Sequence, residues 1–249
     1  MPPLDTPPIS AGDLMDAWEA ASGRTGWARP LALLAAAGDR DPDGLADLPL
    51  GLRDRHLAAL RRSVFGPSVQ ATAACPACAE PAELSFLLDE VLPPAPPAPE
   101  GTVDRAGYQV RFRLPTTTDL GAVTAAQPGD VDAAAADLLA RCVVSATGPS
   151  GSAVPAAELP GDVAEAVSAA MARADPAADV ALALDCPACG HRWAAPFDVA
   201  AFVWQEVDAW AERTLLEVDG LARAYGWQEP AVLALSPWRR RRYLEMAGR

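Results

Sequence analysis

The sequence contains one tetrapeptide twice, as Cys75-Pro76-Ala77-Cys78 and again as Cys186-Pro187-Ala188-Cys189. The flanking residues repeat as well, with a valine six residues before each first cysteine and a phenylalanine eight residues after each second one. These residues are Val69 and Val180, and Phe86 and Phe197. On both sides of each tetrapeptide, apolar residues alternate with polar or small ones, as in half-buried strands. The sequence therefore predicts two equivalent strand–turn–strand hairpins.

The spacing of the four cysteines is typical of a metal site. A two-residue spacer lets both sulfurs of one turn reach the same ion, and two such turns close a tetrahedral shell around Zn²⁺. A closed shell leaves no position for a substrate, so we expect one structural Zn²⁺ bound by Cys75, Cys78, Cys186 and Cys189. The two pairs are 107 residues apart, far more than in a usual zinc ribbon. The ion would therefore hold together the ends of an inserted subdomain.

The same spacing has a second interpretation, because Cys-Pro-x-Cys also occurs in thioredoxin-like dithiol sites, where the first cysteine opens a helix. Here alternation and a proline follow each motif, at Pro81 and Pro196, and a redox dithiol needs one pair only. We favour zinc and keep a thiol oxidoreductase as an alternative. We expect His191 to stand outside the filled shell and Cys142 to be a small core residue.

The composition limits the classes of partner. The chain has 20 basic and 33 acidic residues, a net charge of −13, and all 20 basic residues are arginine. An acidic chain repels phosphate groups and anionic membranes, which argues against both as partners. Five cysteines without a secretory signal predict free or metal-bound thiols in the cytoplasm. No apolar run is long enough to span a bilayer.

The expected fold class is α+β and mainly helical, built around the zinc-ribbon-like pair of hairpin knuckles, with an inserted α+β subdomain. Apolar residues at steps of three and four predict helices, and Ser236-Pro237 predicts the capped start of a last one. The predicted helices cover residues 11–22, 30–37, 52–65, 116–126, 130–146, 161–174, 199–225 and 237–247. Alternation predicts a strand over residues 108–114.

These elements divide the chain into four predicted parts. They are N-terminal helices (1–67), a zinc-ribbon-like core (68–92 plus 180–199), an inserted subdomain (93–179) and C-terminal helices (200–249). A proline-rich linker at residues 93–99 opens the insertion, because proline lacks the donor and the backbone freedom that helix and sheet require.

No catalytic motif accompanies the cysteines, so we expect a protein that is not an enzyme. The chain has two histidines, no glycine-rich phosphate loop and no G-x-S-x-G turn. The C-terminal helices instead carry Trp, Tyr and Arg, the residues that dominate the energetics of protein interfaces. The candidate partner-binding residues are Trp204, Trp210, Tyr225, Trp227, Trp238, Arg239, Arg240, Arg241, Arg242 and Tyr243. For the arginine block, a solvated helix end that favours the helix dipole is the alternative.

The C-terminal third resembles a phage family in the stretches Trp204–Trp210, Leu221–Trp227 and Leu233–Arg240. Leu14–Glu19 and Pro30–Leu34 resemble the same family near the N-terminus. It is the family of T-even-type baseplate hub assembly chaperones, whose relatives are found in contractile-injection-system and tailed-phage gene clusters.

The resemblance implies an assembly factor or accessory subunit of a contractile, phage tail-like baseplate, with baseplate or hub proteins as partners and no catalytic residues. Because the phage-type chaperone need not have paired zinc knuckles, a transient chaperone and a resident baseplate subunit both stay open. The alternative from the residues themselves is a zinc-ribbon adaptor or regulatory protein. The net charge of −13 and the lack of a basic stripe beside the knuckles argue against nucleic acid as its ligand.

Overall fold

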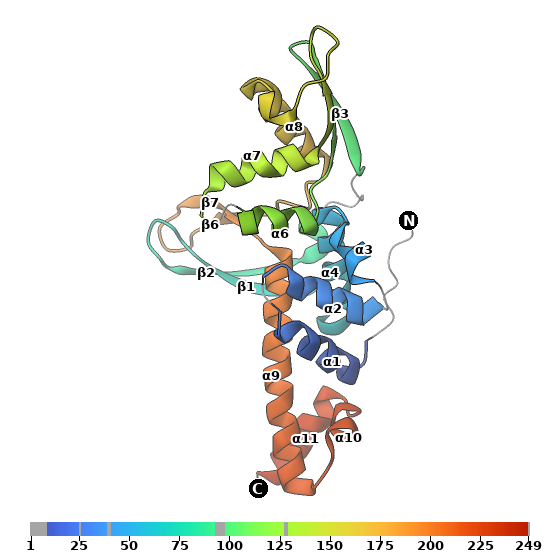
Figure 1. Ribbon diagram of the computed structural model, residues 1–249. Helices are drawn as coiled ribbons and strands as arrows, with labels where there is room; N and C mark the ends of the chain where they lie inside the picture. The colour runs from blue at the N-terminus through green and yellow to red at the C-terminus, as the bar shows by residue number, and fades with distance from the viewer. Residues whose placement is uncertain (1–8, 25, 39–40, 93–97, 127–128, 249) are drawn as a thin grey trace. The chain divides into compact units, whose positions relative to one another are not determined.

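The structure, a computed structural model, describes residues 9–24, 26–38, 41–92, 98–126 and 129–248. It is an α+β protein, mostly helical, whose sheets are small and antiparallel (Figure 1). The predicted fold class is therefore confirmed. Most of the predicted proline-rich linker, residues 93–97, lies outside the described residues. Among the described helices, none combines the length and the apolarity that crossing a membrane requires.

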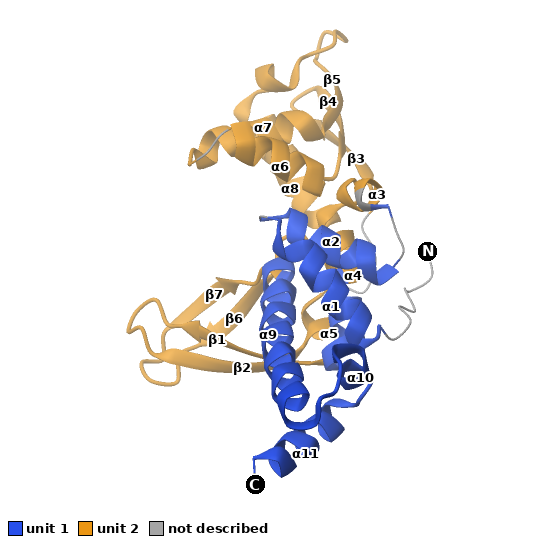
Figure 2. Ribbon diagram, turned by 60° about the horizontal axis from the view of Figure 1, so that its bottom comes forward, with its two compact units in different colours: residues 1–42, 57–66, 199–249 blue, residues 43–56, 67–198 orange. Residues whose placement is uncertain are grey.

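The chain forms two compact units (Figure 2). Unit 1 comprises residues 1–42, 57–66 and 199–249, and unit 2 comprises residues 43–56 and 67–198. Helix α4 (Leu50–Phe65) contributes its first half to unit 2 and its second half to unit 1. The four-part division stays a prediction from the sequence.

Unit 1 is helical. Its elements are α1 (Ala11–Ser22), α2 (Ala28–Gly38), the second half of α4, α9 (Val199–Tyr225), α10 (Glu229–Leu233) and α11 (Pro237–Ala247). Helix α9 buries one face, which includes Val199, Val203, Val207, Ala211, Thr214 and Leu221. Its polar residues hold neighbouring helices: Asp208 accepts the indole N–H of Trp18 at 2.7 Å, and Glu206 pairs with Arg61 at 2.7 Å.

The part of unit 2 that was predicted as an inserted subdomain contains a three-stranded sheet of order β3-β4-β5. The strands are β3 (Glu100–Arg105), β4 (Tyr108–Arg113) and β5 (Val143–Thr147), and the helices are α6 (Thr117–Ala126), α7 (Val131–Cys142), the 3₁₀ turn η1 (Ala156–Glu158) and α8 (Gly161–Ala174). Its core consists of Val110, Phe112, Leu114, Ala146, Val163 and Val167. A short helix, α3 (Pro42–Ala46), also belongs mostly to this unit.

Several elements differ from the sequence-based expectations. The helix predicted over residues 130–146 ends at Cys142, and the next five residues form β5 on the edge of β4. The β-branched Val143 and Val144 favour the extended backbone wherever a strand edge accepts them. Strand β3 and helices α3 and α10 were not predicted, because each is short and carries little periodicity.

The two predicted hairpins are present in unit 2 as separate two-stranded antiparallel sheets. One pairs β1 (Ser68–Ala74) with β2 (Pro81–Leu87), and the other pairs β6 (Ala181–Asp185) with β7 (Arg192–Pro196). A short helix, α5 (Leu88–Val91), follows β2. The hairpins lie in the same part of the unit in both views (Figures 1 and 2).

Candidate metal centre

The two hairpins have the same register around their cysteines. Ala74 pairs with Pro81 at the end of the first hairpin, and Asp185 pairs with Arg192 at the equivalent position of the second. The same backbone hydrogen bond joins the ends of each turn, from Cys75 N–H to the carbonyl of Glu80 at 3.0 Å and from Cys186 N–H to the carbonyl of His191 at 2.9 Å. The repeat seen in the sequence is thus a repeat of backbone geometry.

Each turn contains one residue in the left-handed region, immediately after the second cysteine. These residues are Ala79 (φ 60°) and Gly190 (φ 71°). Their N–H groups donate to the carbonyls of Cys75 at 2.8 Å and Cys186 at 3.0 Å. The left-handed step folds the chain back after the second cysteine, so both sulfurs of a pair face the same point. Glycine adopts this conformation freely, whereas the Cβ of Ala79 makes it costly.

The four sulfurs converge from the two hairpins. They all lie within 4.8 Å of one another, with Cys75 Sγ 3.8 Å from Cys189 Sγ and Cys78 Sγ 3.6 Å from Cys186 Sγ. A tetrahedral ion with Zn–S bonds of about 2.3 Å requires sulfur–sulfur distances of about 3.8 Å. The arrangement therefore fits one tetrahedral metal ion. Cys75 and Cys186 are buried, and Cys78 and Cys189 are exposed.

The thiols of the cluster differ in pKa. Backbone N–H groups, first that of Cys189, lower the pKa of Cys186 to about 7. The backbone N–H of Glu80 lowers the pKa of Cys78, but the neighbouring sulfurs and desolvation outweigh it and raise that pKa to about 12. One thiolate is thus favoured beside a neighbour that keeps its proton. Because thiolates are the metal-binding form, an ion bound here displaces the remaining protons.

An apolar contact joins the two hairpins. The rings of Phe86 and Phe197, the pair found in the sequence repeat, meet edge to face with centroids 5.4 Å apart. Val69 is fully buried, and Val180 nearly so. Two-stranded sheets are marginal by themselves, so this aromatic contact contributes to the stability of the pair of hairpins.

The other sequence-marked residues of this region lie outside the sulfur cluster. Among the described residues, the potential metal-binding group consists of the four cysteines alone. His191 is exposed, and its ring stacks on that of Trp193 with the ring centroids 6.2 Å apart. Cys142 is buried in unit 2, as expected, and desolvation raises its pKa to about 11. An inert thiol of this kind is a core residue.

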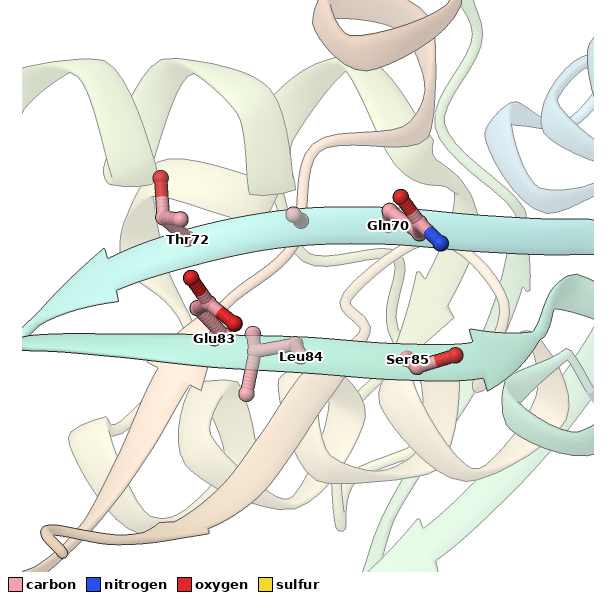
Figure 3. A pocket seen from close by; sticks show the side chains of 6 residues that line it. Gln70, Thr72, Glu83, Leu84 and Ser85 are labelled. Carbon is pink, nitrogen blue, oxygen red and sulfur yellow. The ribbon is translucent and has the colours of Figure 1, made fainter.

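A shallow hollow lies on the first hairpin (Figure 3). Its volume is about 560 Å³, and its lining consists of Gln70, Ala71, Thr72, Glu83, Leu84 and Ser85. Glu83 is the one ionisable group of that lining. A lone carboxylate without a partner acid or base in the same lining is a poor acid–base site, so the hollow gives no support to catalysis.

The predicted partner-binding residues lie in unit 1 and divide into two groups. Trp204 and Trp210 are half-buried on α9, and the guanidinium of Arg29 lies 5.0 Å from the ring centroid of Trp204. The others gather where α9 ends and α11 packs against it. There Tyr225, Trp227 and Tyr243 form an aromatic cluster with centroid distances of 4.9 to 6.0 Å.

Arg240 differs from the other three arginines of its block. It is 2% exposed, and its Nε lies 2.6 Å from Glu217 of α9 while its Nη1 donates to the carbonyl of Leu235 at 2.8 Å. Its guanidinium is therefore engaged inside the chain. Arg239, Arg241 and Arg242 are exposed. Sequence reasoning missed Glu217, because nothing local relates it to a residue 23 positions later.

Fold and site together define a class: an α+β protein in which two hairpins, far apart in the sequence, bring four cysteines together. The chain belongs to the family described as T4 bacteriophage base plate protein, which matches residues 38–204. The match includes both cysteine pairs and all the residues between them. The expected baseplate relationship is thus confirmed, although most of the C-terminal stretches that suggested it lie beyond the matched residues. No curated protein and no solved structure matches the chain.

Proposed function

We propose that this protein is an assembly factor or accessory subunit of the baseplate of a contractile, phage tail-like particle. The observation that carries the proposal is the family match over residues 38–204. The protein acts by binding other baseplate proteins and not by catalysis. In support, the described part of the chain brings four cysteine sulfurs within 4.8 Å of one another, an arrangement that suits a structural metal ion.

The metal of that shell is one structural Zn²⁺, held by Cys75, Cys78, Cys186 and Cys189. The sulfur–sulfur distances of 3.6 and 3.8 Å support this choice, as do the four thiolate donors, which Zn²⁺ accepts in tetrahedral geometry. The ion supplies no chemistry to a substrate. It fixes the two hairpins to each other and so holds both ends of the insertion. Thiolate ligation of this kind suits the reducing cytoplasm, where we place the protein.

The narrower role is that of a hub assembly chaperone, which binds hub or wedge proteins before the particle is complete. The resemblance of Trp204–Trp210, Leu221–Trp227 and Leu233–Arg240 to that family supports it. A transient chaperone and a resident subunit differ in one observable: only the second remains in finished particles.

A native pull-down of the tagged protein from its own cells, with sedimentation and mass spectrometry, tests the proposal. We expect baseplate proteins to co-purify. Their recovery in small complexes, without full particles, identifies a chaperone, and recovery within full particles identifies a resident subunit. A chain that sediments alone and carries no baseplate protein at any stage of particle formation contradicts the proposed function.

A further inference from the structure

We propose that the outer face of α11 is a docking surface for an acidic protein surface that offers an apolar pocket to Trp238. We define this Arg–Trp face by Trp238, Arg239, Arg241, Arg242 and Met246. The proposal rests on the proposed function in one respect, since it takes the acidic surface to belong to another baseplate protein.

The Arg–Trp face is exposed along the whole helix. Trp238 is 71% exposed and Met246 is 53% exposed, so this face presents two large apolar side chains to solvent. Trp238, Arg242 and Met246 follow one another at steps of four, so they lie along one side of α11. The side therefore combines an apolar anchor with cationic groups.

The opposite side of α11 fixes the helix rigidly. Buried Arg240 bonds to Glu217 of α9, and the hydroxyl of Tyr225 donates to the carbonyl of Tyr243 at 3.1 Å. Ser236 caps the helix, with its hydroxyl accepting the N–H of Arg239 at 3.3 Å. The backbone of a helix held in this way loses little conformational freedom on binding, which favours affinity.

The charge of the Arg–Trp face is opposite to that of the chain as a whole. Four of the 20 basic residues are consecutive at positions 239–242, in a chain with 33 acidic residues. Within the described residues, Arg239 and Arg241 have no ion-pair partner, and Arg242 pairs with Glu245 at 2.8 Å. The face keeps a net positive charge, and its complement is therefore acidic.

An acidic protein matches both components of the face better than a phosphate polymer does. Three exposed arginines on a helix of 11 residues make a small cationic patch, whereas nucleic-acid binding depends on many phosphate contacts and is opposed by a net charge of −13. A protein surface also provides a preformed pocket for a Trp side chain. Trp and Arg are the residues most enriched at the energetic centres of such interfaces.

The test measures the affinity of the full-length protein for each baseplate protein of the same genome, purified singly. The variants are Trp238→Ala and the double charge reversal Arg241→Glu/Arg242→Glu. Their matched controls are Trp27→Ala, at another exposed tryptophan, and Arg105→Glu/Arg111→Glu, at two arginines whose side chains are 60% and 54% exposed. Because the replaced residues are at the surface, circular dichroism and the unfolding temperature should match those of the parent protein.

We expect each α11 variant to weaken binding to one baseplate protein by at least roughly tenfold, and the controls to change it less than twofold. Added salt should slow association of the parent protein more than that of the charge-reversal variant. Acidic-to-Arg substitutions on the partner should restore binding of that variant.

Three results overturn the inference. If the α11 variants bind baseplate proteins as tightly as the parent, the surface is wrong while the proposed function stands. If the parent binds no baseplate protein, the proposed function and the inference fail together. If the charge reversal instead abolishes binding to duplex DNA, to anionic vesicles or to a second copy of the chain, with baseplate binding unchanged, the face has another occupant.

Discussion

The carboxylate of Asp175 reaches the first turn of α4, 124 residues earlier in the sequence, where it accepts the N–H of Gly51 at 2.8 Å. It satisfies one of the backbone donors that a helix start leaves without a partner, as an N-cap side chain does. Asp175 is 2% exposed, and desolvation raises its pKa. The contact requires glycine, because a Cβ at position 51 would lie 1.9 Å from Asp175 Oδ1.

We therefore expect Gly51→Ala to lower the free energy of unfolding by about 1–3 kcal/mol, the usual cost of overpacking. The matched control is Gly161→Ala in the first turn of α8, where an added Cβ meets nothing within 4 Å. That change should be neutral or stabilise the protein by up to about 1 kcal/mol. Urea unfolding measures both, and equal effects of the two substitutions would contradict this account of Gly51.

Asp119 has the opposite pKa shift from Asp175. Burial raises its pKa, but bonds from Arg113 (2.6 and 2.8 Å) and from the N–H of Thr116 (3.0 Å) outweigh burial and leave the pKa below its usual 3.8. Thr116 and Asp119 thus form a capping box at the start of α6, in which the Thr116 hydroxyl also accepts the N–H of Asp119 at 3.3 Å.

Because its folded pKa is depressed, Asp119 stabilises the fold fully above the unfolded pKa of about 4 and progressively less as the pH falls through the folded pKa. Asp119→Asn should cost about 2 kcal/mol at pH 7, and the difference from the parent should shrink below pH ~4. Urea unfolding at a series of pH values measures it. Glu100→Gln, in an exposed pair with Arg111, is the control, expected within about 1 kcal/mol of the parent. If the difference in unfolding free energy between Asp119→Asn and the parent does not depend on pH, the depressed pKa of Asp119 is not its cause.

At the scale of elements, one partly buried ion pair contributes to the attachment of α11 to α9. Arg240 and Glu217 meet at 2.6 Å, with side chains that are 2% and 26% exposed. The aromatic cluster of Tyr225, Trp227 and Tyr243 packs beside it. Removing one partner of such a pair leaves the other charge desolvated, which costs more than the pair itself contributes.

Arg240→Met should lower stability by roughly 3 kcal/mol and expose the amides of α11 to hydrogen exchange. The double variant Arg240→Met/Glu217→Leu should recover part of the loss, since it leaves no unpaired charge. Arg223→Met, which breaks an exposed pair with Asp219 on α9, is the control and should cost at most about 0.5 kcal/mol. If the double variant is less stable than Arg240→Met, the unpaired charge of Glu217 is not the cause of the lost stability.

Elements also show where local sequence stops being sufficient. Helices α1, α9 and α11 follow their predicted bounds because caps and apolar periodicity are encoded within the helix itself. Residues 143–146 were predicted as helix and are strand, because the edge of β4 is supplied by residues more than 30 positions earlier. Backbone pairing with a distant strand overrides the helical preference of neighbouring alanines.

At the scale of the whole molecule, we expect the proposed Zn²⁺ to control the order of the hairpins in unit 2. Chelation of the ion, or Cys186→Ser, should remove most of the bound zinc and lower the unfolding temperature, because metal binding is coupled to folding. Hydrogen exchange should accelerate first in residues 68–87 and 181–197. Elemental analysis together with exchange mass spectrometry measures both effects.

Cys142→Ser provides the matched control, since Cys142 is buried in unit 2 and is not one of the four clustered cysteines. It should retain about one zinc ion per chain, whatever it costs in packing. Full zinc content and unchanged exchange in the Cys186→Ser protein would show that the four sulfurs are not the metal site.

The sequence alone was sufficient for the fold class, the two equivalent hairpins, the four clustered cysteines and the main helices. Each of these features follows from residue spacing in the sequence: two residues between paired cysteines, alternation in strands, and steps of three and four in helices. Only the tertiary structure placed Arg240 inside the protein and its three neighbours outside, brought Asp175 to the start of α4 and added β3 and β5 to β4. The physical reason is that burial, ion pairing and sheet formation depend on contacts between residues that are far apart in the sequence. Local sequence patterns do not specify which distant residues come into contact.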